Sequence, residues 1–143
     1  MRRELADGYE LDDDPARIDV EAVHDFLSNH AHWALGWPYD EVERLIREAQ
    51  RVVGLYQGDE LVGFTRTVSD GHWLTYLADC YVLPEHRGRS LGFELVRETV
   101  EAGPYANLGW LLHTAYASGL YEKFGFVTRS DYLMERASRE EPS

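Results

Sequence analysis

The segment from Tyr76 to Gly92 constrains the fold of this chain more than any other stretch. An apolar, strand-like run ends at Pro84, a tight turn containing Gly88 follows, and a helical pattern begins near Leu91. In a strand–turn–helix of this kind, several backbone N–H groups and the positive end of the helix dipole point at one spot. Such a spot binds anions, phosphates above all, and Arg87 and Arg89 add positive charge beside it. The segment therefore predicts a phosphate-bearing ligand.

Length and composition predict one domain spanning residues 1–143, with a polar tail at 137–143. Apolar residues make up 44% of the chain, which is enough for a core of its own. The longest apolar runs are far too short to span a membrane, and no apolar stretch follows the basic residues of the N-terminus. Cys80 is the only cysteine, so no internal disulfide is expected. These features favour a cytoplasmic protein.

The net charge of −12 argues against a nucleic-acid partner, because general nucleic-acid binders carry the opposite sign. An acidic surface attracts cationic substrates over long distances. Solubility, or adaptation to high salt, explains the same charge without any ligand. Both interpretations stay open at this point.

Hydrophobic periodicity predicts alternating helices and strands. Val20, Val23 and Leu27 share a helical face behind Asp19, an expected N-cap, and a second helix is expected to begin at Asp40 as its cap. A third helix is expected at 91–101 and a short one around 117–124. Strands are expected at 9–11, 51–57, 61–68, 74–83, 110–114, 126–128 and 132–136. This order predicts an α/β or α+β domain with a mixed sheet.

The run from Val82 to Gly92 resembles the acetyl-CoA motif of the GNAT N-acetyltransferase superfamily, Arg/Gln-x-x-Gly-x-Gly/Ala, usually preceded by Val-x-Pro-Glu. The run from Leu120 to Phe126 resembles the C-terminal Leu-Tyr-x-x-x-Gly-Phe signature of the same family. Together with the order of elements, the resemblance covers roughly residues 9–136. It implies a mixed, mostly antiparallel sheet flanked by about four helices and splayed between the fourth and fifth strands. It also implies transfer of an acetyl group from acetyl-CoA to a primary amine, without a metal.

The resemblance assigns cofactor contacts to two parts of the motif. The backbone of Tyr81, Val82 and Leu83 would pair with the pantetheine arm and orient the thioester carbonyl. Backbone N–H groups of the turn would hold the pyrophosphate, at Arg87, Gly88, Arg89, Ser90, Leu91 and Gly92. Two positions depart from the family pattern. Ser90 stands where the family has its middle glycine, and Thr114 stands where many relatives have an asparagine that contacts the cofactor arm.

Two residues are catalytic candidates. In many relatives the tyrosine at the position of Tyr121 protonates the departing thiolate, and a phenol suits this task because its ordinary pKa is about 10. The other interpretation of Tyr121 is a core aromatic. Asp79 is an acid among apolar strand residues, which is unusual. It would bind the substrate ammonium or relay its proton; alternatively it is an exposed residue or pairs with an arginine. His113 is a weaker candidate for the base.

The aromatic stretch from His30 to Tyr39 has the family's usual position for an acceptor-pocket loop. Trp33 and Trp37 would hold an amine by cation–π contact or shape an apolar pocket, unless they pack the helix junction. A metal site from His24, His30 and His32 is not expected, because no other ligand cluster supports it.

The leading prediction is therefore an enzyme that acetylates a small-molecule amine. The alternatives are a non-catalytic acyl-CoA-binding or sensing module, and an N-acetyltransferase that acts on proteins or peptides. Homodimers are common among similar proteins, and no feature of this sequence decides the matter.

Overall fold

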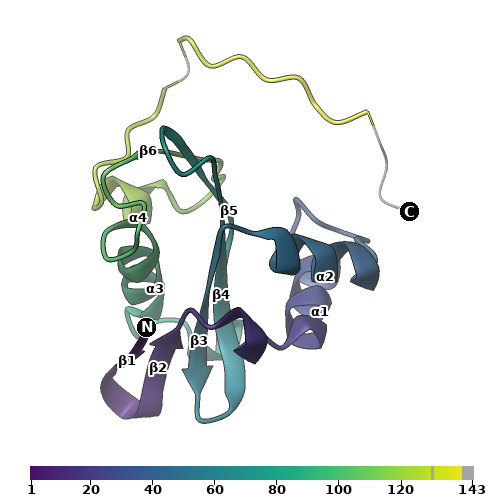
Figure 1. Ribbon diagram of the computed structural model, residues 1–143, viewed down its shortest axis with the longest axis vertical. Helices are drawn as coiled ribbons and strands as arrows, with labels where there is room; N and C mark the ends of the chain where they lie inside the picture. Colours follow the sequence, from purple (N-terminus) through teal and green to yellow (C-terminus); the bar gives the residue numbers. More distant parts are fainter. Residues whose placement is uncertain (130, 140–143) are drawn as a thin grey trace.

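The structure is a computed structural model that describes residues 1–129 and 131–139. Its six strands form one sheet in chain order, antiparallel from β1 to β5 and parallel between β5 and β6 (Figure 1). The strands are β1 (Arg2–Glu4), β2 (Tyr9–Asp12), β3 (Arg51–Gln57), β4 (Glu60–Ser69), β5 (Leu74–Val82) and β6 (Gly109–Leu112). The helices are α1 (Val20–His30), α2 (Tyr39–Glu48), α3 (Leu91–Val100) and α4 (Ser118–Glu122). The predicted mixed, mostly antiparallel sheet with four helices is confirmed.

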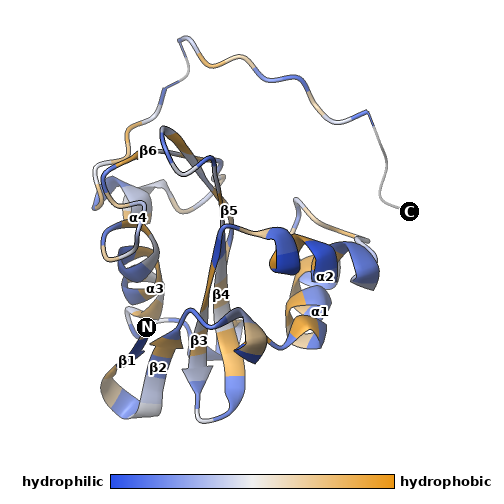
Figure 2. Cartoon of the chain, viewed as in Figure 1, coloured by the Kyte–Doolittle hydropathy of each residue, from blue (hydrophilic) through white to orange (hydrophobic). Residues whose placement is uncertain are grey.

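Helices cover both faces of the sheet, and the apolar side of each main helix turns toward the strands (Figure 2). On one face, α1 and α2 bury Val23, Leu27 and Val42 against Phe64 of β4. On the other face, α3 buries Leu95 against the middle strands, while Val96 and α4 close a third cluster around Leu77. Asp19 caps α1 as predicted, because its Oδ1 accepts a hydrogen bond of 3.1 Å from the Ala22 amide.

The sheet opens between its last two strands, β5 and β6. β5 pairs with β6 only along Leu74 to Leu77, opposite Gly109 to Leu112. Beyond Leu77, β5 keeps its partner β4 on one side, with Tyr81 opposite Phe64 and Val82 opposite Gly63. The other edge of β5 has no partner strand among the described residues. This opening is the predicted splay between the fourth and fifth strands, which are β5 and β6 once the short β1 is counted.

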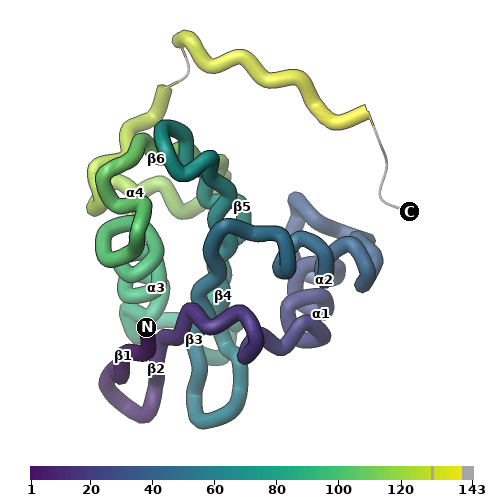
Figure 3. The backbone as a smooth tube through the Cα atoms, in the orientation of Figure 1, coloured from purple at the N-terminus to yellow at the C-terminus, as the bar shows by residue number. Residues whose placement is uncertain are grey.

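Three predictions of local structure differ from the structure. The strands expected at 126–128 and 132–136 are wrong, because the described residues of both segments form no strand. Phe126 packs against the cluster around Leu77, and the chain at 131–139 runs away from the sheet (Figure 3). Tyr132, Leu133 and Met134 are exposed there, so an apolar pattern that would suit a strand has no partner strand in the chain as described. β1 was not predicted, because three polar residues give no periodicity. α2 begins at Tyr39, with Pro38 and not Asp40 at the cap position.

No helix in the described part of the chain is long and apolar enough to cross a membrane. The opening between β5 and β6 is bordered by β5, by the turn that follows it and by the segment after β6.

Candidate functional site

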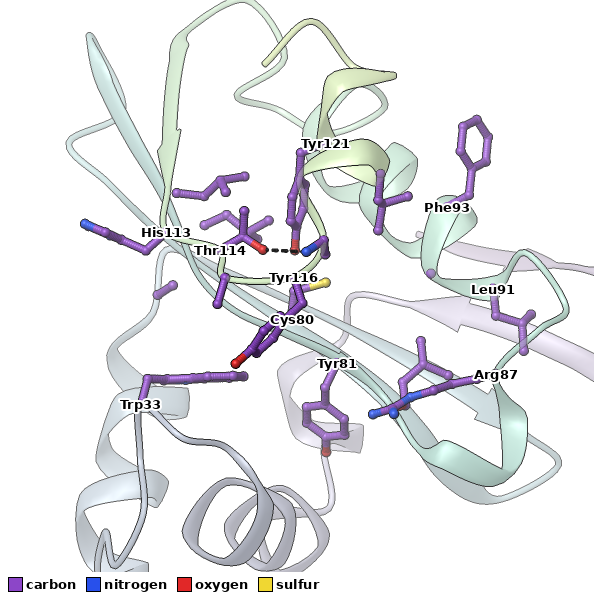
Figure 4. Close-up of a pocket in the computed structure, with 18 of the residues that line it drawn as sticks. Trp33, Cys80, Tyr81, Arg87, Leu91, Phe93, His113, Thr114, Tyr116 and Tyr121 are labelled. Carbon is purple, nitrogen blue, oxygen red and sulfur yellow. Dashed lines mark hydrogen bonds between the residues drawn. The ribbon is translucent and has the colours of Figure 1, made fainter. Parts of the chain in front are cut away.

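A cleft of about 1020 Å³ lies where β5 and β6 part. Its walls come from the segment after α1, from β5, from the turn and first residues of α3, and from the segment that joins β6 to α4. Figure 4 shows Trp33, His113 and Tyr116 toward one end of the cleft, and Arg87, Leu91 and Phe93 toward the other, with Cys80 and Tyr121 between them.

The turn between β5 and α3 exposes a row of backbone amides. Gly88 and Ser90 have positive φ values of 83° and 61°, which bend the chain sharply before α3 begins. Within the described residues, no hydrogen bond occupies the N–H groups of Gly88, Arg89 or Ser90. The positive end of the ten-residue helix α3 lies immediately behind them. This arrangement fits a phosphate, as the sequence predicted for the turn.

The residues predicted to bind the cofactor divide into two groups. Those that line the cleft are Tyr81, Val82, Arg87, Gly88, Ser90, Leu91, Gly92 and Thr114. Leu83 instead packs between two core clusters, and Arg89 is exposed outside the cleft lining. Arg87 also folds back on the strand, since its Nε donates to the Val82 carbonyl at 2.9 Å. Thr114 accepts a hydrogen bond of 3.0 Å from the Ala117 amide, the dashed line in Figure 4.

Tyr121 extends from α4 into the middle of the cleft, and only 8% of it is exposed. Burial raises the pKa of its phenol, and the neighbouring Cys80 acts in the same direction. The hydroxyl therefore stays protonated throughout the neutral and mildly alkaline range, ready to donate a proton.

Cys80 on β5 faces Tyr121 in the middle of the cleft. Burial raises the pKa of the Cys80 thiol to about 11, although the neighbouring Tyr121 side chain opposes this rise. Because the thiolate is the nucleophilic form, Cys80 is a poor nucleophile at neutral pH.

Asp79 is engaged on both of its oxygens. Oδ1 accepts a hydrogen bond of 2.7 Å from Nε1 of Trp33, and Oδ2 accepts one of 2.6 Å from Nε of Arg66. The residue is 2% exposed and does not line the cleft. The sequence left open whether Asp79 is exposed, binds substrate or pairs with an arginine; in the structure it pairs with Arg66. The arrangement ties the loop after α1 to the sheet through the indole of Trp33.

The aromatic loop contributes one of its two tryptophans to the cleft. Trp33 lines the cleft together with His30 and His32, whereas Trp37 packs against the core beneath α1 and α2. His24 bonds to the Trp37 carbonyl at 3.0 Å and does not approach the other imidazoles in the cleft. Within residues 1–129 and 131–139, no group of three or more His, Cys, Asp or Glu side chains is arranged to hold a metal ion.

Sequence reasoning missed two features of the cleft. Tyr116 enters it from the segment before α4, where no motif marked it. His113 bonds through Nδ1 to the Tyr76 hydroxyl and through Nε2 to Glu135, 2.7 Å away. The partners of Asp79 had a sequence signal, because the hairpin turn at 69–71 brings Arg66 opposite Asp79 in antiparallel register.

A mixed sheet that splits beside a turn rich in free amides, with a buried phenol facing the split, is the framework of a transferase that takes its group from a phosphate-bearing carrier. The family model described as Acetyltransferase (GNAT) family matches residues 9–126, so the chain belongs to the GNAT acetyltransferase family. The family assignment makes the protein an acetyltransferase, as the sequence predicted.

Individual relatives agree with this assignment. A crystal structure of a protein described as a GNAT-family acetyltransferase from Xanthomonas campestris pv. campestris is 32% identical, covers 91% of this chain and 93% of its own, and has a TM-score of 0.85. A family member from Streptococcus pneumoniae is 25% identical, covers 92% of this chain and 99% of its own, and has a TM-score of 0.72. The peptidyl-lysine N-acetyltransferase YjaB of Salmonella typhimurium is 29% identical over 77% of this chain and 70% of its own.

Proposed function

We propose that the protein transfers the acetyl group of acetyl-CoA to a primary amine of a small molecule, by direct attack in a ternary complex. The observation that carries this proposal is the open edge of β5, which runs from the free amides of residues 88–90 to the buried hydroxyl of Tyr121. The amides suit the pyrophosphate of the carrier, and the open strand edge offers backbone groups to its amide-containing arm.

In this proposal the reaction uses the two substrates and one proton donor of the protein, Tyr121. The ammonium group loses one proton to solvent, and the neutral amine nitrogen then attacks the thioester carbonyl carbon. The nitrogen loses its second proton to solvent as the tetrahedral intermediate breaks down. The new C–N bond forms, the C–S bond breaks, and the departing thiolate takes the proton of the Tyr121 hydroxyl. Solvent returns that proton to Tyr121 afterwards. The products are the N-acetylated amine and free CoA.

Asp79 acts in this scheme as a positioning residue. Its bonds to Trp33 and Arg66 hold the acceptor side of the cleft in place, and neither oxygen is free to take the proton of the amine. Ser90 and Thr114, the two departures from the family motif, both line the cleft and leave its opening intact.

Replacing Tyr121 by phenylalanine tests the proton donor. We expect kcat to fall about 100-fold, because the thiolate would leave without general acid catalysis. Calorimetric titration should give the same affinity for acetyl-CoA as in the unmodified protein. Tyr39→Phe is the matched control, since Tyr39 lies on α2 outside the cleft lining. An unchanged single-turnover rate in Tyr121→Phe would remove Tyr121 from the mechanism.

Cofactor use itself is tested by calorimetric titration with acetyl-CoA, free CoA and ADP. One-site binding of acetyl-CoA and CoA, with weaker binding of ADP, is expected because ADP lacks the arm that would lie along β5. Absence of acetyl-CoA binding at millimolar concentration, in low and in high salt, would refute the proposal. It would favour loss of the phosphate site through Ser90.

A lysine side chain is the second candidate acceptor, because the YjaB relative is named a peptidyl-lysine N-acetyltransferase. A lysine-containing peptide in the same CoA-release assay as small amines compares the two candidates directly.

A further inference from the structure

The lining of the cleft carries no acidic side chain among the described residues, although the chain contains 26 aspartates and glutamates. The charged or titratable basic residues along the cleft are His30, His32, His86, Arg87, His113 and Lys123. A protein with a net charge of −12 thus has a cleft from which carboxylates are absent. Arg87 and His86, next to the turn, suit the phosphates of the carrier. At the opposite end of the cleft the titratable basic side chains are histidines, which lie among aromatic rings and small or aliphatic residues.

Two carboxylates contact lining residues from outside, and both have partners. Asp79 is occupied by Trp33 and Arg66. Glu135 bonds to Nε2 of His113. A ligand with several positive charges would therefore enter the cleft without a free carboxylate to pair with its additional cations. Moving unpaired charges out of water is unfavourable, so the cleft selects against polycations.

Two exposed aromatic rings face the acceptor end from opposite walls. Trp33 comes from the segment after α1 and is 41% exposed, and Tyr116 comes from the segment before α4 and is 95% exposed. Figure 4 shows both rings reaching into the cleft, with Tyr116 between Trp33 and the centre where Cys80 and Tyr121 lie.

The two rings differ in how they are held. The indole of Trp33 is fixed by its 2.7 Å bond to Asp79 and by an edge contact with His32, whose ring centre is 5.1 Å away. Tyr116 makes no hydrogen bond or ring contact within the part of the chain that the structure describes. One wall of the acceptor end is therefore rigid, and the other is free to adjust to a bound molecule.

We infer that the acceptor is an arylalkylamine-like molecule: a primary amine on a short aliphatic chain, with a flat aromatic body and no second positive charge. This inference rests on the proposed function and names the substrate class of the same site. The aromatic body packs between Trp33 and Tyr116, where a flat ring buries apolar area against two others. The amine then points toward the centre of the cleft, beside Cys80 and Tyr121. The long-range attraction of the acidic surface brings the monocation to the protein, and the cleft itself discriminates against higher charge.

The test compares amines by the rate of CoA release from acetyl-CoA. The aromatic probes are 2-phenylethylamine and tryptamine, n-hexylamine is the aliphatic probe of similar size, and spermidine and kanamycin are the polycations. We expect kcat/KM for the aromatic amines to exceed that for n-hexylamine by about tenfold, and the polycations to fall below n-hexylamine.

Two variants assign the preference to the named rings. Trp33→Leu and Tyr116→Leu should each lower the ratio of aromatic to aliphatic kcat/KM toward one. Trp73→Leu is the matched control, because Trp73 is 79% exposed and lies outside the cleft lining, and it should leave the ratio unchanged. Tyr116 has no packing partner, so its variant keeps the test valid even if Trp33→Leu does not fold.

The outcomes separate this inference from the proposed function. Failure to bind acetyl-CoA by calorimetry would overturn both. Binding of acetyl-CoA with higher kcat/KM for a polycation than for the aromatic amines would overturn the inference alone. The inference alone would also be overturned if neither aromatic amine is acetylated, or if the ratio survives both Leu variants.

Discussion

At the scale of single residues, Tyr121 and Asp79 have different surroundings in the folded chain. Tyr121 and Asp79 were both predicted to be catalytic, and both are buried. Tyr121 faces the cleft, where it lies beside the thiol of Cys80. Asp79 faces Arg66 and Trp33 instead. Alternation along a strand gives the face of a residue, but a bulge between Arg66 and Thr67 shifts the register just there.

Ser90 has a backbone conformation that is unfavourable for serine. Its φ of 61° and ψ of 19° lie in the left-handed region, and its side chain makes no capping hydrogen bond to α3. Residues other than glycine, asparagine and aspartate rarely adopt this conformation. The family glycine at this position is therefore explained by backbone geometry as well as by close approach to a phosphate.

Ser90→Gly should raise the free energy of unfolding by about 1 kcal/mol, because the strain of the left-handed conformation is relieved. It should also bind acetyl-CoA more tightly, by roughly threefold, because the backbone can move closer to the phosphate. Ser90→Val should lose at least about 1 kcal/mol of unfolding free energy, since a β-branched residue is still less suited to positive φ. Calorimetric titration and denaturant unfolding measure the two effects. Ser118→Val, at an exposed site in α4, is the control. Equal stability of the Ser90→Val and Ser118→Val proteins would argue against strain at Ser90.

At the scale of elements, most helices and strands were predictable because each combines a clear period with a turn signal. β3, β4 and β5 follow this rule, as do α1 and α3. The strands that were predicted wrongly or missed share one physical cause: a β-strand forms only where another strand can hydrogen-bond to it. β1 has a partner in β2 despite its polar sequence, whereas the apolar residues 132–134 have none in the described chain. The local sequence pattern does not show whether a segment will have a partner strand.

The pair formed by Asp79 and Arg66 joins β4, β5 and the loop after α1. Asp79→Asn should lower the free energy of unfolding by about 3 kcal/mol, because it leaves the guanidinium of Arg66 buried without its counter-charge. Urea titration measures this loss. Asp59→Asn, in the exposed turn between β3 and β4, should change stability by less than about 0.5 kcal/mol.

Asp79→Asn also distinguishes a positioning role of Asp79 from a role as the proton acceptor. If Asp79 acts through Trp33, Asp79→Asn raises KM for the acceptor and leaves the affinity for acetyl-CoA and the pH profile of kcat intact. Loss of the acidic limb of that profile, with KM unchanged, would instead make Asp79 the proton acceptor.

At the scale of the whole molecule, three buried tyrosines and the half-buried Cys80 keep their protons to higher pH in the folded protein than in the unfolded chain. Burial raises the pKa of Tyr56 to about 12 and that of Cys80 to about 11, and it also raises the pKa values of Tyr81 and Tyr121. Ordinary values are about 8.5 for cysteine and about 10 for tyrosine. Above about pH 8.5 the unfolded chain therefore binds fewer protons than the folded protein, so the free energy of unfolding falls as pH rises.

We expect the free energy of unfolding to be about 3 kcal/mol lower at about pH 10.5 than at about pH 8, as measured by denaturant titration at several pH values. Cys80→Ala should flatten the curve between about pH 8.5 and about pH 10, where the thiol is the first of the four groups to contribute. A free energy that stays constant across this range would show that these side chains are not buried as described.

Lys123, which lines the cleft with its Nζ 5.8 Å from the centre of the Phe93 ring, is the only lysine of the chain. Amine-reactive labels therefore have one side-chain target, and it sits on the wall of the site. A fluorophore or crosslinker attached there would report occupancy of the cleft without any engineered residue. Protection of this lysine from labelling by an added ligand would serve as a footprint that can be read by mass spectrometry of the intact protein.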